Sequence, residues 1–167
     1  GTMSITWWNC GRAVASALKQ PEAAEVVVVD DASGDDGATV RAAEAADDGS
    51  GRLKVFALPR NAGPSAARNA AIRASKAAWI AILDSDDFME PGRLGKLLVL
   101  GQQGYDLLAD DLLQVPEGQP VSSGKPLWFR DDQTPADVDF GFFIDSNISR
   151  ASRMRRELGF LKPLMRR

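Results

Sequence analysis

Short apolar runs alternate with alanine-rich, helix-favouring segments over residues 12–112. The apolar runs are read as buried strands at 25–29, 53–58, 79–83 and 105–109. The segments around them predict helices over Arg12–Gln20, Ala38–Ala46, Gly63–Ser75 and from Pro91 onward. This strand–helix alternation predicts an α/β fold, with a mostly parallel sheet and helices on both of its faces.

The pattern changes after residue 112. Prolines and glycines over 115–125 predict a loop, and the aromatic stretches 127–129 and 140–144 require a core to pack against. We therefore divide the chain into residues 1–112 and a second region, 113–167. The end of that region, from Arg150, is basic; it is interpreted as a solvated helix face, with contact to an anionic membrane surface as the alternative.

Composition narrows the possible chemistry. The chain has 167 residues, 44% of them apolar, and a net charge of -3, so no attraction to nucleic acid is expected. The absence of histidine excludes Ser-His-Asp and Cys-His triads and the usual zinc sites. A single cysteine, Cys10, indicates a reducing compartment. With no apolar run of spanning length and no visible signal peptide, we expect a cytoplasmic protein.

A first polar constellation, 30–36, follows the strand at 25–29. In open α/β sheets, ligands bind at the carboxyl ends of the strands. Asp30 and Asp31 stand at that end, where a carboxylate can accept hydrogen bonds from a base or ribose. Asp35 and Asp36 are interpreted as caps of the next helix.

A second constellation, 60–69, links another strand to a helix. A helix N-terminus offers free amides and a positive dipole end, which suit a phosphate. Asn61 and Gly63 lie at this start, and Arg68 lies about one turn inside, where it could add a charge-assisted contact. The alternative for Arg68 is an ordinary surface position on an alanine-rich helix.

The third constellation is Asp84-Ser85-Asp86-Asp87, directly after the run 79–83. Carboxylates packed this closely repel one another unless a cation or hydrogen bonds neutralise them. A D-x-D at a strand end therefore favours a divalent metal and a phosphorylated ligand. The alternative is helix capping by Asp87 or Glu90.

Together these segments, VVVVDDASGDD, RNAGPSAARNAAIRAS and AWIAILDSDDFMEPGRL, resemble the family 2 glycosyltransferases. The tail GFLKPLMRR is similar to members that build bacterial exopolysaccharides and cell-envelope glycans. The resemblance implies the GT-A fold, a Rossmann-like three-layer α/β/α arrangement. It also implies an enzyme that moves a sugar from a nucleotide-sugar, favoured as a UDP-hexose, to a glycan or lipid-linked acceptor with inversion.

The resemblance assigns roles residue by residue. Asp31 contacts the base, with Asp30 beside it, and Arg68 lies near the ribose and phosphates. Asp86 is the expected ligand of Mn²⁺ or Mg²⁺, while Asp84 reaches the metal or the ribose. Residues 1–112 would then be the donor-binding half and 113–167 a partial acceptor side with a basic tail, at the inner face of the cell membrane if that tail binds lipid.

No segment after Asp87 matches the acidic motif that supplies the base in inverting members. Asp145 is a candidate acceptor or donor contact, and the catalytic base is unassigned; we expect a GT-A fold truncated before it. Two alternatives stay open. One is a response-regulator receiver domain, in which Asp84 would accept a phosphoryl group. The other is a donor-binding fragment without turnover.

Overall fold

The computed structural model describes residues 8–104, 107–108, 110, 112–126 and 153–155. Its helices are α1 (Trp8–Leu18), α2 (Ala38–Glu44), α3 (Pro64–Ala74), α4 (Arg93–Gly101) and a 3₁₀ turn, η1 (Val121–Ser123). Its strands are β1 (Val26–Asp30), β2 (Leu53–Ala57), β3 (Trp79–Ala81), β4 (Leu107–Leu108), β5 (Leu113–Gln114), β6 (Lys125–Pro126) and β7 (Arg153–Arg155). The order of elements along the chain confirms the predicted α/β fold.

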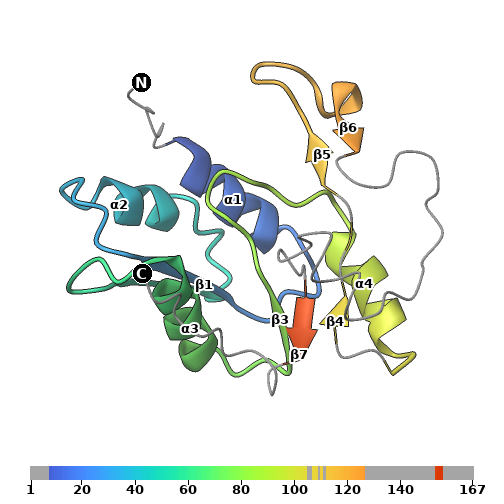
Figure 1. Ribbon diagram of the computed structural model, residues 1–167, viewed down its shortest axis with the longest axis horizontal. Coiled ribbons are helices and arrows are strands. Elements are labelled where there is room, and N and C mark those ends of the chain that lie inside the picture. The colour runs from blue at the N-terminus through green and yellow to red at the C-terminus, as the bar shows by residue number, and fades with distance from the viewer. Residues whose placement is uncertain (1–7, 105–106, 109, 111, 127–152, 156–167) are drawn as a thin grey trace, which may run out of the picture.

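Strands β1 and β2 are parallel neighbours, paired from Val26 with Leu53 to Asp30 with Ala57. Helices α1 and α2 cover one face of this pair and α3 covers the other, which gives three layers (Figure 1). On the α1–α2 side the buried side chains pack against alternate residues of both strands, as the period of a strand requires. This core contains Val14, Leu18, Ala43, Val26, Val28, Leu53 and Val55.

A second sheet has the order β3–β7–β4, in which β7 is antiparallel to both neighbours. Strands β3 and β4 therefore run in the same direction, and their C-terminal ends lie at the same edge. Strand β3 ends at Ala81, although the apolar run predicted a strand to Leu83. Leu83 packs instead beside a core cluster of Ala23, Met89 and Leu94.

The segment after the acidic cluster is anchored to the end of α1 by Gln20. This side chain is fully buried; its Nε2 donates to the carbonyl oxygen of Glu90 at 2.9 Å, and its Oε1 accepts the N–H of Leu94 at 3.2 Å. The hydroxyl of Ser16 accepts the N–H of Met89 at 2.9 Å. Buried polar groups need such partners, so these bonds fix residues 89–94 against α1.

Other elements differ in detail from the predictions. Helix α4 begins at Arg93 and not at Pro91, because Gly92 has a φ of 76° and interrupts helical geometry ahead of it. Of the predicted loop 115–125, residues 115–124 connect β5 to β6, a short antiparallel pair, and include the turn η1, whereas Lys125 belongs to β6. Residues 153–155 form a strand, not part of a helix. The aromatic stretches 127–129 and 140–144, Asp145 and the rest of the basic tail lie outside the described residues.

Candidate functional site

Asp30 is the last residue of β1 and is 8% exposed. Its carboxylate accepts the backbone N–H of Ser33 at 3.3 Å and also the Ser33 hydroxyl. Because both bonds stay within one short turn, Asp30 shapes the loop that follows β1. The neighbouring Ala32 has a φ of 54°, so the chain turns sharply here and leaves the sheet.

Asp31 joins the end of β1 to the start of α3. Its two carboxylate oxygens accept the backbone N–H groups of Ala62 at 2.8 Å and Gly63 at 2.7 Å. Gly63 has a φ of 89°, a conformation that side chains disfavour, which explains a glycine immediately before Pro64. In this arrangement Asp31 accepts hydrogen bonds from backbone amides that could otherwise bind an anion at the helix N-terminus. Asn61 lies exposed in the same connection.

Arg68 joins α3 to the acidic cluster. Its Nη2 lies 2.6 Å from Oδ1 of Asp84, and the two side chains are 34% and 28% exposed. Through Asp31 and Arg68, the three polar constellations that the sequence separates by many residues are connected by direct contacts. A site at this edge could therefore present a carboxylate, a guanidinium and a second carboxylate to one ligand.

Asp86 lies exposed in the turn at residues 85–86, and the N–H of Asp87 donates to the carbonyl oxygen of Asp84 at 3.1 Å. Within the described part of the chain, no three acidic, histidine or cysteine side chains gather closely enough to make a complete metal centre. Two aspartates nevertheless fit Mg²⁺ or Mn²⁺, because such ions prefer oxygen and are often held by one or two carboxylates plus substrate phosphates.

Asp35 has the capping role predicted for it. It accepts the N–H groups of Gly37 at 2.9 Å, Ala38 at 3.0 Å and Thr39 at 3.0 Å, and the Thr39 hydroxyl at 2.6 Å. The Thr39 hydroxyl, followed by these amides, lowers the pKa of the Asp35 carboxyl against the opposing effect of burial. Asp35 therefore stabilises the start of α2 and is not grouped with Asp30 and Asp31 in the candidate site.

Helix α1 contributes two side chains near this edge that the sequence did not single out for the site. The guanidinium of Arg12 lies 3.6 Å from the centre of the Phe88 ring, one residue beyond the acidic cluster. Burial, and then the negative charge of Asp30, raises the pKa of the Cys10 thiol. A raised pKa reduces the thiolate fraction, so Cys10 behaves as a small core residue.

Arg93 and Asp110 form a second ion pair near the end of a strand. Arg93 Nε and Nη2 donate to the two oxygens of Asp110 at 2.6 and 2.8 Å. Asp110 follows β4 closely, as Asp84 follows β3, and the two strands are parallel to each other. The sequence could have identified Asp110, because an acid directly follows a short apolar run there. It could not have identified Arg93 as the partner of Asp110.

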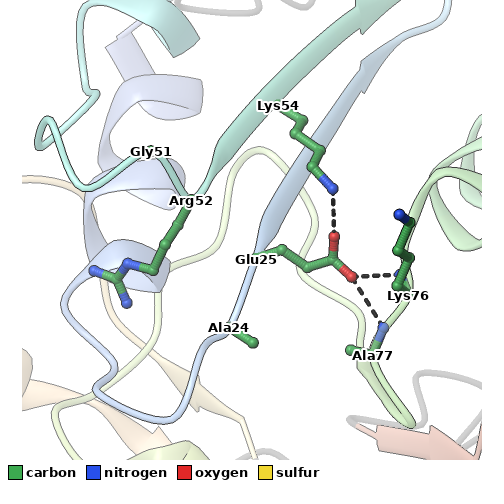
Figure 2. Close-up of a pocket in the computed structure, with 7 residues that line it drawn as sticks. All are labelled: Ala24, Glu25, Gly51, Arg52, Lys54, Lys76 and Ala77. Atoms are coloured by element: carbon green, nitrogen blue, oxygen red, sulfur yellow. Dashed lines mark hydrogen bonds and ion pairs between the residues drawn. The ribbon is translucent and has the colours of Figure 1, made fainter.

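A hollow lies at the opposite edge, where β1 and β2 begin. Its lining residues are Ala24, Glu25, Gly51, Arg52, Lys54, Lys76 and Ala77 (Figure 2). Glu25 is bound there by Lys54 at 2.6 Å and by the N–H groups of Lys76 at 2.5 Å and Ala77 at 3.0 Å. The Glu25 carboxylate neutralises Lys54 and connects the starts of β1 and β2 to the segment at Lys76 and Ala77. We therefore assign this hollow a structural role, apart from the acidic cluster at the other edge.

The chain belongs to glycosyl transferase family 2, whose sequence model matches residues 9–157. The family has the GT-A fold, and its members typically use a divalent metal. Membership makes the receiver-domain alternative wrong.

Two similar proteins come from Rhizobium meliloti (strain 1021) and are named for succinoglycan biosynthesis. ExoU is 52% identical over 156 residues, which cover 93% of this chain and 44% of ExoU. ExoO is 38% identical over 161 residues, which cover 93% of this chain and 43% of ExoO. An uncharacterized glycosyltransferase of Haemophilus influenzae is 40% identical over 67 residues, 38% of this chain and 27% of that protein. The chain thus spans less than half the length of these relatives.

Among the helices that the structure describes, none combines the length and the apolar character needed to cross a membrane.

Proposed function

We propose that this chain contains the donor-binding half of a glycosyltransferase that acts in the synthesis of a bacterial exopolysaccharide. The donor would be a nucleotide-sugar, favoured as a UDP-hexose, and the acceptor a growing glycan or a lipid-linked glycan. Family membership and the names of the two Rhizobium relatives support this reading. Transfer with inversion is the stereochemistry that the family resemblance favours.

The observation that carries the proposal is the contact path from Asp31 through α3 and Arg68 to Asp84. Along this path, helix α3 connects the proposed base-binding loop at Asp31 to the proposed diphosphate-binding cluster at Asp84. Sites built on such elements hold their groups in a fixed geometry, which favours binding of one extended ligand.

Each site residue has a proposed role along that path. Asp30 and Asp31 form the base end, where Asp31 also holds the loop containing Asn61 and Gly63. Arg68 binds the ribose–phosphate region by charge-assisted hydrogen bonds. Asp86, with Asp84, would hold Mn²⁺ or Mg²⁺.

When bound, that metal would supply charge stabilisation for the departing nucleoside diphosphate. The chain's own residues bind and orient the donor.

Residues 1–112 are proposed as the donor-binding half and 113–167 as part of the acceptor side. Pairing of β7 with β3 and β4 supports a second region that packs on the first. Asp145 remains a candidate contact in that region. A cytoplasmic location, with contact to the membrane surface through the basic tail, is the corresponding proposal for where the enzyme works.

A thermal-shift screen tests this function. The chain is heated with UDP-, GDP-, ADP- and dTDP-sugars, with and without Mn²⁺, and we expect stabilisation that requires both nucleotide and metal. Asp86→Asn should abolish the metal-dependent part, whereas Glu44→Gln, which removes a charge from the exposed side of α2, should not. Absence of metal-dependent stabilisation by every donor would contradict the proposal. Binding without sugar transfer would favour the donor-binding fragment without turnover.

A further inference from the structure

We propose that Arg68 makes cation binding at Asp84 conditional on a diphosphate, so that this residue selects nucleoside diphosphates over monophosphates; the inference rests on the proposed function. The starting observation is the 2.6 Å contact between Arg68 Nη2 and Asp84 Oδ1. Without a ligand, the guanidinium therefore occupies an oxygen of the first aspartate in the D-x-D.

Electrostatics opposes sharing of that oxygen. A divalent cation would lie about 2.0–2.6 Å from a carboxylate oxygen, as Mg²⁺ and Ca²⁺ do in proteins. A guanidinium hydrogen-bonded to the same oxygen would then be only a few ångströms from the cation, and like charges at such separations repel strongly. Asp84 can use Oδ1 as a ligand only after Arg68 has turned away, and its other oxygen stays close to the positive guanidinium. Asp86 is therefore the carboxylate that a cation can approach in the ligand-free protein without displacing Arg68.

A diphosphate offers Arg68 another partner. Guanidinium groups form paired hydrogen bonds with phosphate oxygens, and such bonds are stronger than those between neutral groups. Arg68 is 34% exposed, so its side chain has access to solvent and to a ligand. Helix α3 is meanwhile held by Asp31, so the backbone at Arg68 keeps its position while the side chain changes partner.

Charge then determines the selectivity. A diphosphate has enough oxygens and negative charge to bind both Arg68 and a cation held by Asp84 and Asp86. A monophosphate that binds Arg68 leaves less charge to hold the cation. The ligand that most effectively replaces Asp84 as the partner of Arg68 is thus a nucleoside diphosphate or its sugar ester. The cation binds together with that ligand.

Manganese titration followed by electron paramagnetic resonance tests this exchange, because free and bound Mn²⁺ differ in signal. In wild type we expect weak Mn²⁺ binding alone, strong enhancement by UDP and little by UMP. Arg68→Gln should tighten Mn²⁺ binding in the absence of nucleotide by about fivefold, the size expected for loss of a partly exposed ion pair. The same substitution should reduce the enhancement by UDP.

Two further variants keep the result interpretable. Arg73→Gln removes the same charge from the last turn of α3 and should leave Mn²⁺ affinity near that of wild type. Arg68→Lys keeps the charge but not the planar guanidinium and should be intermediate. Circular dichroism establishes that each variant is folded.

The outcomes separate the two proposals. If wild type binds Mn²⁺ with UDP but Arg68→Gln leaves or weakens the affinity for Mn²⁺ alone, Arg68 merely orients Asp84 and the inference is overturned. If wild type shows no Mn²⁺-dependent UDP binding, the assigned donor fails. The comparison made with Mn²⁺ alone still decides whether Arg68 competes for Asp84.

Discussion

The carboxylate of Asp31 accepts the backbone N–H of Gly63 at 2.7 Å, so a side chain just after β1 holds the residue that immediately precedes α3. Its other oxygen holds Ala62 in the same way at 2.8 Å. This pair of bonds matters beyond its own loop, because α3 carries Arg68. The base end and the diphosphate end of the proposed donor site are consequently positioned by one rigid element.

Asp31→Ala should therefore weaken both the fold and the donor site. Loss of two charge-assisted bonds leaves two amides without this acceptor, which should lower the free energy of unfolding by roughly 1–2 kcal/mol. Donor affinity should fall as well, because the loop and Arg68 lose their fixed position. Urea unfolding and calorimetric titration measure the two effects. Glu44→Ala is the charge control, and equal behaviour of the two variants would contradict the role of Asp31.

Gln20→Ala should destabilise the chain by about 2–3 kcal/mol, because it removes buried volume and the hydrogen bonds of Gln20 to the Glu90 carbonyl and from the Leu94 N–H. Gln103→Ala, at an exposed position, should have little effect. Urea unfolding provides the comparison. A small loss in Gln20→Ala would mean that the segment following the acidic cluster is not anchored through this amide.

Stability should depend on Glu25 in a pH-dependent manner. Burial opposes its ionisation, but bonds from Lys54, Ser75, Lys76 and Ala77 prevail and lower its pKa from 4.5 to about 2. A carboxyl with a depressed pKa stabilises the folded state above its unfolded pKa, and this contribution is lost as the pH falls from 4.5 toward 2. Glu25→Gln should accordingly be less stable than wild type at neutral pH, by about 1–2 kcal/mol.

The difference between wild type and Glu25→Gln should shrink below pH 4.5. Urea unfolding from pH 7 to pH 3 follows it. A constant difference across this range would show that the charge of Glu25 contributes nothing and that only packing was changed.

Local features of this chain were predictable from the sequence. The cap formed by Asp35 depends on residues within four positions along the chain, and its chemistry is evident from an aspartate just ahead of a helix. The acids that follow β1 and β3 were equally accessible, because a short apolar run followed by carboxylates predicts a strand end. Family resemblance then supplied the order of the motifs.

Long-range features were not predictable in the same way. Partner choice between Arg93 and Asp110, or between Glu25 and Lys76, depends on tertiary packing that brings distant segments together. Strand β7 illustrates the same limit: residues 153–155 complete a sheet with β3 and β4, although their composition suggested a solvated helix. The sequence around Arg153–Arg155 gives no local indication that this segment pairs with β3 and β4.

Paramagnetic broadening by Mn²⁺ in isotope-labelled protein reports which amides lie near the metal and so locates the proposed donor site. With Mn²⁺ and UDP together, we expect broadening of the amides of residues 84–87 and of Ser65–Arg68. Amides near Glu25 and Ala77, at the opposite edge, should keep their intensity. Broadening centred on Glu25, or none that depends on UDP, would contradict a donor site at Asp84 and Asp86.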